Sequence, residues 1–132
     1  MDVMATPTNT SNYLPSSGLA EVAQMTSADG TNESAALITG SASGKRIKEI
    51  RVFSGPNIAI PPGSVLVLKL YDGANSRTIG SAICPGGADA LQAFFAFTNF
   101  FLPNASCAIK GQLRTSLPSG AVLDWSFMGE NF

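Results

Sequence analysis

The 132-residue sequence contains no histidine, and this absence narrows the chemistry that the chain can perform. Histidine is the usual general base of Ser/His/Asp and Cys/His sites and the commonest metal ligand. The nine acidic residues form no paired-carboxylate motif, and several fall in turns, where aspartate caps backbone N–H groups. The sequence therefore predicts a protein that is not an enzyme and has no catalytic residues.

Charge and long apolar runs are also scarce. Charged residues make up 13% of the chain, against about a quarter in a typical globular protein, and the net charge is -1. So weak a field does not gather nucleic acid or an anionic membrane surface. The most apolar stretch, residues 91–102, is shorter than the roughly 20 residues that span a bilayer, and polar residues interrupt it. We expect neither nucleic acid nor a membrane as a partner.

Metal and cofactor sites lack the residues that they require. Each acidic loop has a single carboxylate, whereas calcium needs several oxygen ligands close together. The segment GSASGKR at 40–46 is superficially similar to a phosphate-binding loop, but its glycines are one residue too close and Arg46 replaces the metal-binding hydroxyl. Cys84 and Cys107 lie at apolar stretches and are predicted to be buried packing residues. We expect no cofactor and no metal.

Turn-forming residues are plentiful and set the predicted fold. The chain has 13 Gly and 8 Pro, and from Leu19 onward apolar segments of about five to ten residues alternate with turn-rich joints. Only 19–25 could instead form a helical turn. We predict an all-β fold over 18–132, a single-domain antiparallel β-sandwich, jelly-roll-like, with about eight short strands.

Several strands have a clear pattern. Leu66, Leu68 and Leu70 share one face of a strand that we expect to be central, and the turn at 72–75 predicts a hairpin that returns with Ile79 and Ile83 in phase. Segments 106–115 and 121–128 alternate most cleanly. Ile47 breaks the alternation of 45–53, which predicts a bulge. Residues 90–102, which include five phenylalanines, should be buried on two faces or lie at an interface.

Two segments supply the candidate protein-contact residues. Residues 1–17 are rich in Thr, Asn, Ser and Pro, which predicts an extended N-terminal arm that either orders against a neighbouring subunit or is a frayed end. A basic cluster follows a stretch of 44 residues that has no base, and it is either a contact patch or the solvated face of one strand. The candidates are Tyr13, Leu14, Lys45, Arg46, Lys48 and Arg51.

The order of several short segments resembles a family of bacteriophage head decoration proteins, also called cement proteins. The segments are ALITG at 36–40, GKRIKEIRV at 44–52, LKLYDG at 68–73, RTIG at 77–80, LP at 102–103 and DWSFMGENF at 124–132. The resemblance covers about three-quarters of the chain. It implies a structural virion protein on the outer capsid surface that binds the major capsid protein and itself.

The resemblance implies a small homo-oligomer, and a trimer is the working expectation, although no residue selects three subunits over two. The start of the chain lacks the basic and apolar regions of a secretion signal, so we expect synthesis in the bacterial cytoplasm. Two alternatives stay open. One is another virion component, a head fibre base or a tail protein. The other is a carbohydrate-binding module, for which only Trp125, Tyr13 and Tyr71 could supply the usual aromatic platform.

Overall fold

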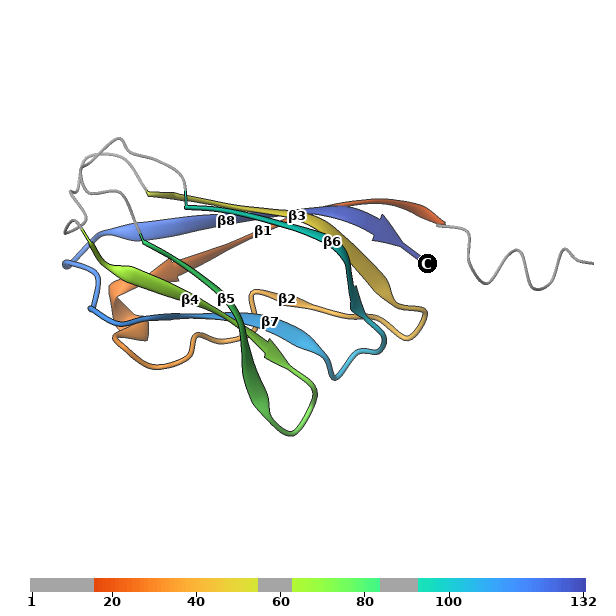
Figure 1. Ribbon diagram of the computed structural model, residues 1–132, viewed down its shortest axis with the longest axis horizontal. Helices are drawn as coiled ribbons and strands as arrows, with labels where there is room; N and C mark the ends of the chain where they lie inside the picture. The colour runs from red at the N-terminus through yellow and green to blue at the C-terminus, as the bar shows by residue number, and fades with distance from the viewer. Residues whose placement is uncertain (1–15, 55–62, 84–92) are drawn as a thin grey trace, which may run out of the picture.

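The computed structural model describes residues 16–54, 63–83 and 93–132 (Figure 1). The predicted arm therefore lies outside the described residues except for its last two positions. The described part contains eight strands, one 3₁₀ turn, and no helix long and apolar enough to cross a membrane. The elements are β1 (Ser17–Thr26), η1 (Ser27–Asp29), β2 (Ile38–Thr39), β3 (Lys45–Ser54), β4 (Val65–Tyr71), β5 (Ser76–Ile83), β6 (Ala93–Leu102), β7 (Ala108–Leu113) and β8 (Val122–Asn131).

The strands form two antiparallel sheets that lie one above the other in Figure 1. Sheet A has the order β1-β8-β3-β6 and sheet B the order β2-β7-β4-β5. In this order the strands that are first and last in the sequence pair with each other, as do the second and the seventh, which is the connectivity of an eight-stranded jelly roll. The predicted all-β sandwich is confirmed, and the segment 19–25 is a strand and not a helical turn.

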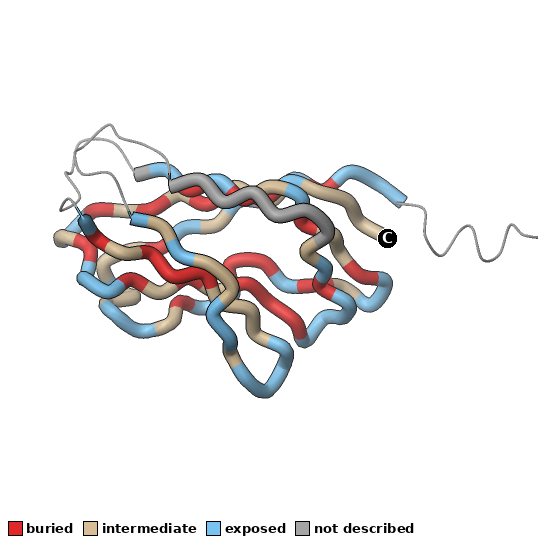
Figure 2. Tube along the Cα trace, in the orientation of Figure 1, coloured by how far each residue is buried: buried red, intermediate tan, exposed pale blue. Residues whose placement is uncertain are grey.

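The core lies between the sheets and takes its side chains from alternate positions of the inner strands. Trp125 and Phe127 of β8 are 1% and 0% exposed, and their rings stack with centroids 6.0 Å apart. Ile50 and Val52 of β3 and Leu66 of β4 are buried in the same cluster. Figure 2 shows the buried residues recurring along both layers. Each such side chain contributes roughly 1.5–3 kcal/mol by leaving water.

Most of the strand patterns are confirmed. β4 lies inside sheet B, between β7 and β5, as its two apolar faces predicted. In β8 every second residue from Leu123 to Phe127 is buried, and β7 buries Ile109 and Leu113. Cys107 is a free, buried thiol, which confirms its packing role, and Cys84 lies outside the described residues.

Two bulges alter the alternation, and the sequence revealed one of them. The register of β3 shifts between Ile47 and Glu49, so that Ile47 and Ile50 are both fully buried; this is the predicted bulge. A second shift, between Leu68 and Lys69, leaves Ile79 of β5 as the extra residue. Ile79 packs against the core, but Ile83 is 69% exposed. The expectation that these two isoleucines share a phase was wrong because the bulge lies beside them.

The phenylalanine-rich segment forms β6, an edge strand of sheet A. Phe100 packs against the core, whereas Phe101 is 42% exposed and its ring meets that of Phe132 edge to face, with centroids 5.7 Å apart. The side chains of Phe94, Phe95 and Phe97 lie outside the described residues.

Gly129 allows β8 to pass the β3 bulge. It pairs with Ile47, and a methyl group at this position would overlap the carbonyl oxygen of Arg46, a backbone atom that cannot swing aside. Gly129→Ala should therefore lower the free energy of unfolding, measured by urea titration, by about 1–3 kcal/mol. Gly18→Ala is the matched control, because a methyl group there meets only open space. Equal stability of the two variants would contradict this packing.

The turn of the β4–β5 hairpin is capped by a carboxylate. The carboxylate oxygen Oδ1 of Asp72 accepts hydrogen bonds from the N–H groups of Ala74 at 2.9 Å and Asn75 at 2.8 Å, and Gly73 has a φ of 102°. The bonds from Asn75 and Ala74 favour the ionised carboxylate and hold the pKa of Asp72 below its ordinary value of 3.8.

Because the folded chain has the lower pKa, the turn's contribution to stability is complete above pH 3.8 and is lost as the pH falls through the folded-state value. Asp72→Asn keeps an acceptor oxygen but does not titrate. Its melting temperature should approach or pass that of the wild type as the pH is lowered below 3.8, in scans by circular dichroism. Parallel pH profiles for the two proteins would show that the carboxylate charge does not support the turn.

Candidate protein-binding surface

The outer face of sheet A exposes large hydrophobic side chains. Val22 of β1 is 82% exposed, Met128 of β8 is 47% and Phe53 of β3 is 37%. Phe101 of β6 points to the same face, since it lies between Phe100 and Leu102, which pack in the core. An antiparallel sheet with one wet face normally carries polar residues there. A group of exposed apolar residues is therefore the feature that calls for an explanation.

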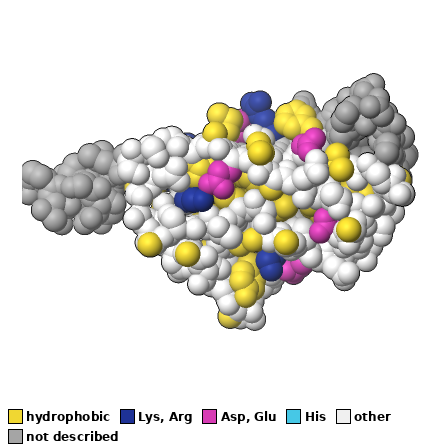
Figure 3. Space-filling model, turned by 180° about the vertical axis from the view of Figure 1, so that it is seen from behind, with side chains coloured by type: hydrophobic (Ala, Val, Ile, Leu, Met, Phe, Trp, Pro, Cys, Tyr) yellow, Lys and Arg dark blue, Asp and Glu magenta, His cyan; other side chains and the backbone are white. Residues whose placement is uncertain are grey.

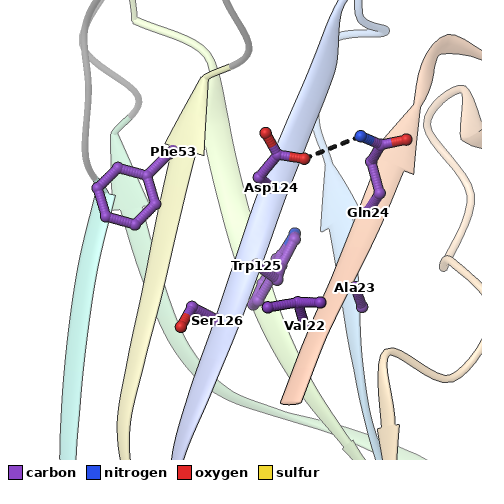
Figure 4. A pocket seen from close by; sticks show the side chains of 7 residues that line it. All are labelled: Val22, Ala23, Gln24, Phe53, Asp124, Trp125 and Ser126. Carbon is purple, nitrogen blue, oxygen red and sulfur yellow. Dashed lines mark hydrogen bonds between the residues drawn. The ribbon is translucent and has the colours of Figure 1, made fainter. Parts of the chain in front are cut away.

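Three strands of this face enclose a shallow hollow of about 560 Å³ (Figure 4). Phe53 lies on one side of β8 and Val22 on the other, and Asp124 and Ser126 of β8 lie between them. The side-chain amide of Gln24 donates a hydrogen bond of 2.8 Å to Oδ1 of Asp124. The hollow can thus hold an apolar group between two hydrophobic walls and can offer hydrogen bonds from its floor.

The strand register explains why these residues meet. Val22 pairs with Ser126 and Gln24 with Asp124 across the β1–β8 ladder, while Phe53 pairs with Asp124 across the β8–β3 ladder. Alternate residues of each strand face the core, so the remaining ones gather on the outside. Trp125 belongs to the inward set and borders the hollow from below, with 1% of its surface exposed.

The basic cluster on β3 is paired with carboxylates. Nζ of Lys45 lies 2.6 Å from Oε2 of Glu21, Nη1 of Arg46 lies 3.1 Å from Oε1 of Glu130, and Nε of Arg51 lies 3.2 Å from Oε1 of Glu49. Lys48 shares Glu130 at 3.4 Å. The structure therefore presents a strand of matched charges rather than a positive patch, and Lys48 and Arg51 are its most exposed cations.

Arg46 belongs to a second small cluster at the C-terminal end of the chain. Its guanidinium lies 5.2 Å from the ring centroid of Phe132, which in turn contacts Phe101. The N–H of Phe132 donates to the carbonyl oxygen of Gly44, which fixes the last residue beside β3. This cluster lies on the outer face of sheet A together with the hollow, and extends the apolar surface toward β6.

The structure describes some of the predicted contact residues and not others. The four basic residues all lie on β3, the strand that also carries the exposed Phe53, and their role in binding stays a prediction. Tyr13 and Leu14 lie outside the described residues. Val22, Phe53 and Met128 were missed. Each of them is an apolar residue at a position where the alternating pattern of its strand calls for a polar one, next to a residue that faces the core. This departure from the pattern is the signal that the sequence contains.

The described residues contain no group of three or more Cys, Asp or Glu side chains placed to hold a metal ion. Figure 3, which views the molecule from behind, shows small groups of hydrophobic side chains between charged and polar ones. Comparison with protein-family models, with curated proteins and with solved structures finds no match to this chain. The fold and this surface together define a jelly-roll β-sandwich with exposed apolar side chains on the outer face of sheet A.

Proposed function

We propose that this chain is a non-enzymatic structural virion protein that decorates a bacteriophage capsid. In this role it binds the outer surface of the major capsid protein and associates with further copies of itself. The observation that carries the proposal is the outer face of sheet A, where Val22 and Phe53 line the hollow and Met128 is also exposed. Exposed apolar groups rimmed by polar residues are typical of protein-binding surfaces.

The surface suits a protein partner in its arrangement as well as its composition. Phe53 and Val22 can contact apolar groups of a partner, and the Gln24–Asp124 pair can exchange hydrogen bonds with its main chain. The paired charges of β3 lie beside this apolar centre, where they would form a polar rim. A rigid sandwich loses little entropy on docking, and many weak contacts over a shell add up through multivalency.

The segments that carry the resemblance to decoration proteins include the inner strands of this face. Residues 44–52 contribute most of β3 and residues 124–132 most of β8, and these two strands are neighbours at the centre of sheet A. The segments at 68–73 and 77–80 fall on the β4–β5 hairpin. The resemblance therefore supports the proposal through residues that build the scaffold and part of the contact face.

The proposal is tested by counting copies of this chain in purified particles of the source phage. Quantitative mass spectrometry should give a ratio near one-to-one, or another large fraction, relative to the major shell subunit. A few copies per particle would assign the chain to a head fibre base or a tail. Complete absence from the particle would refute a virion role.

A substitution tests the surface itself. Phe53→Ala removes one wall of the hollow, so the dissociation constant for undecorated shells should rise roughly tenfold, or by about 1–2 kcal/mol. Ile83→Ala is the matched control, because Ile83 is also an exposed hydrophobic residue but lies on β5 of the other sheet. Both variants should melt close to the wild type. If the two variants lost binding equally, or if neither lost binding, this face would not be the one that contacts the shell.

A carbohydrate-binding role is the second candidate, because the Phe53 ring lies beside a hydrogen-bonded carboxylate–amide pair, a combination that can contact a sugar. The aromatic residues available for it are few. Trp125 is buried, and the hydroxyl of Tyr71 donates to the carbonyl oxygen of Gly73 while its ring faces Lys110. Binding on a glycan array that disappears in Asp124→Ala would favour this function over decoration.

A further inference from the structure

Strand β1 has one hydrogen-bonded side and one open side. It occupies the end of sheet A and pairs with β8 in an unbroken register from Ser17 to Thr26. Among the described residues, its other side has no neighbouring strand. An open strand edge displays main-chain N–H and C=O groups in the spacing of a β-ladder, so it can accept a further strand.

The direction of the open groups follows from the end of the strand. The N–H of Thr26 donates to Oδ2 of Asp29 at 2.8 Å, so it points away from β8. Main-chain groups of alternate residues point to the same side of a strand. The N–H and C=O groups of Ala20, Val22 and Gln24 therefore face the open edge, while those of Ala23 and Met25 face β8.

β1 also lacks the features that protect a strand edge. Natural edges are usually short, bulged, or defended by Lys or Pro. β2 has only two residues, and β5 has a bulge and an exposed Arg77. β6 is bulged against β3. β1 has ten residues, a regular register, and neither Lys nor Arg nor Pro.

We propose that β1 binds β1 of a second copy of this chain, antiparallel and about a two-fold axis that passes beside Val22. The two sheets A would then join into one continuous sheet. Val22 would exchange both main-chain hydrogen bonds with its counterpart, and Ala20 would pair with Gln24 of the partner in the same way. This association does not depend on the capsid role.

The residues of β1 are self-complementary in this register. Val22, the most exposed large hydrophobic side chain among the described residues, would meet its own copy and bury the part of its surface that faces the partner strand. Glu21, the strand's single charged residue, would lie opposite Ala23, so no like charges would meet directly. Glu21 is already neutralised by Lys45 of its own chain. A two-fold interface requires this matching of a surface with itself.

The pairing would also extend the outer face of sheet A beyond the open edge of β1. Val22 forms one wall of the hollow, and the strand added beside it would continue that wall into the partner's sheet. The dimer would present two equivalent hollows on one extended surface. The proposed two-fold pair is an alternative to the trimer predicted from the resemblance, and sedimentation distinguishes the two.

The test measures association of the full-length chain in solution. Sedimentation equilibrium should show a reversible monomer–dimer exchange, and Val22→Lys, which brings two lysines together, should raise the dimer dissociation constant roughly tenfold or more. Met128→Lys adds the same charge to the same face one strand away and should leave the dimer intact. A monomer at all concentrations, a trimer, or an unchanged Val22→Lys dimer would overturn the proposal.

Hydrogen exchange of the unmodified protein is a second test of the β1–β1 pairing, and it needs no substitution. The amides of Ala20, Val22 and Gln24 should exchange fast in dilute solution and slowly at concentrations where the dimer forms. The amides of Ala23 and Met25 should be protected at both concentrations. Deletion of residues 1–15 should leave the dimer unchanged; its loss would assign the open edge to the N-terminal segment of a neighbour and overturn the β1–β1 pairing.

Discussion

The rest of the structure depends on β8, which is paired with a neighbouring strand on both sides along its length. β1 and β3 pair with it over nearly the same residues, and Leu123, Trp125 and Phe127 point from it into the core. Each of these side chains is at most 2% exposed. The C-terminal segment of the chain thus closes sheet A and fills the space between the sheets. A strand buried in this way must be matched in register by both neighbours, which fixes the outer face as well.

Two glycines lie where other atoms of the chain come too close to leave room for a side chain. At Gly111 an added methyl group would lie 2.6 Å from Sδ of Met25 and 2.8 Å from Cζ2 of Trp125. At Gly129 it would meet the backbone of β3 beside the bulge. β7 therefore has a glycine where large core side chains come nearest, and β8 has one where the bulged strand β3 comes nearest. Interiors packed to this density tolerate little extra volume.

The outer face of sheet A joins two surfaces of different character. Near its middle, apolar side chains and one hydrogen-bonded polar pair line a hollow, and beside them Arg46 and Arg51 of β3 are matched by Glu130 of β8 and Glu49 of β3. Paired surface charges add little to stability, about 0–1 kcal/mol each, but they suppress attraction to unrelated polyanions. This combination favours recognition by shape and apolar contact.

Periodicity in the sequence was enough to predict the sandwich, the hairpin at Asp72, the central place of β4 and the inward side chains of β7 and β8, because burial on one face imposes a period of two. It also predicted the bulge at Ile47, where the period fails within one strand. The phase of Ile83 and the apolar face around Phe53 depended on which strands became neighbours, and on a bulge in β5 that leaves no break in its own short pattern. Pairing between distant segments is decided by packing of the whole core, so only the tertiary structure could bring Val22, Phe53 and Met128 together.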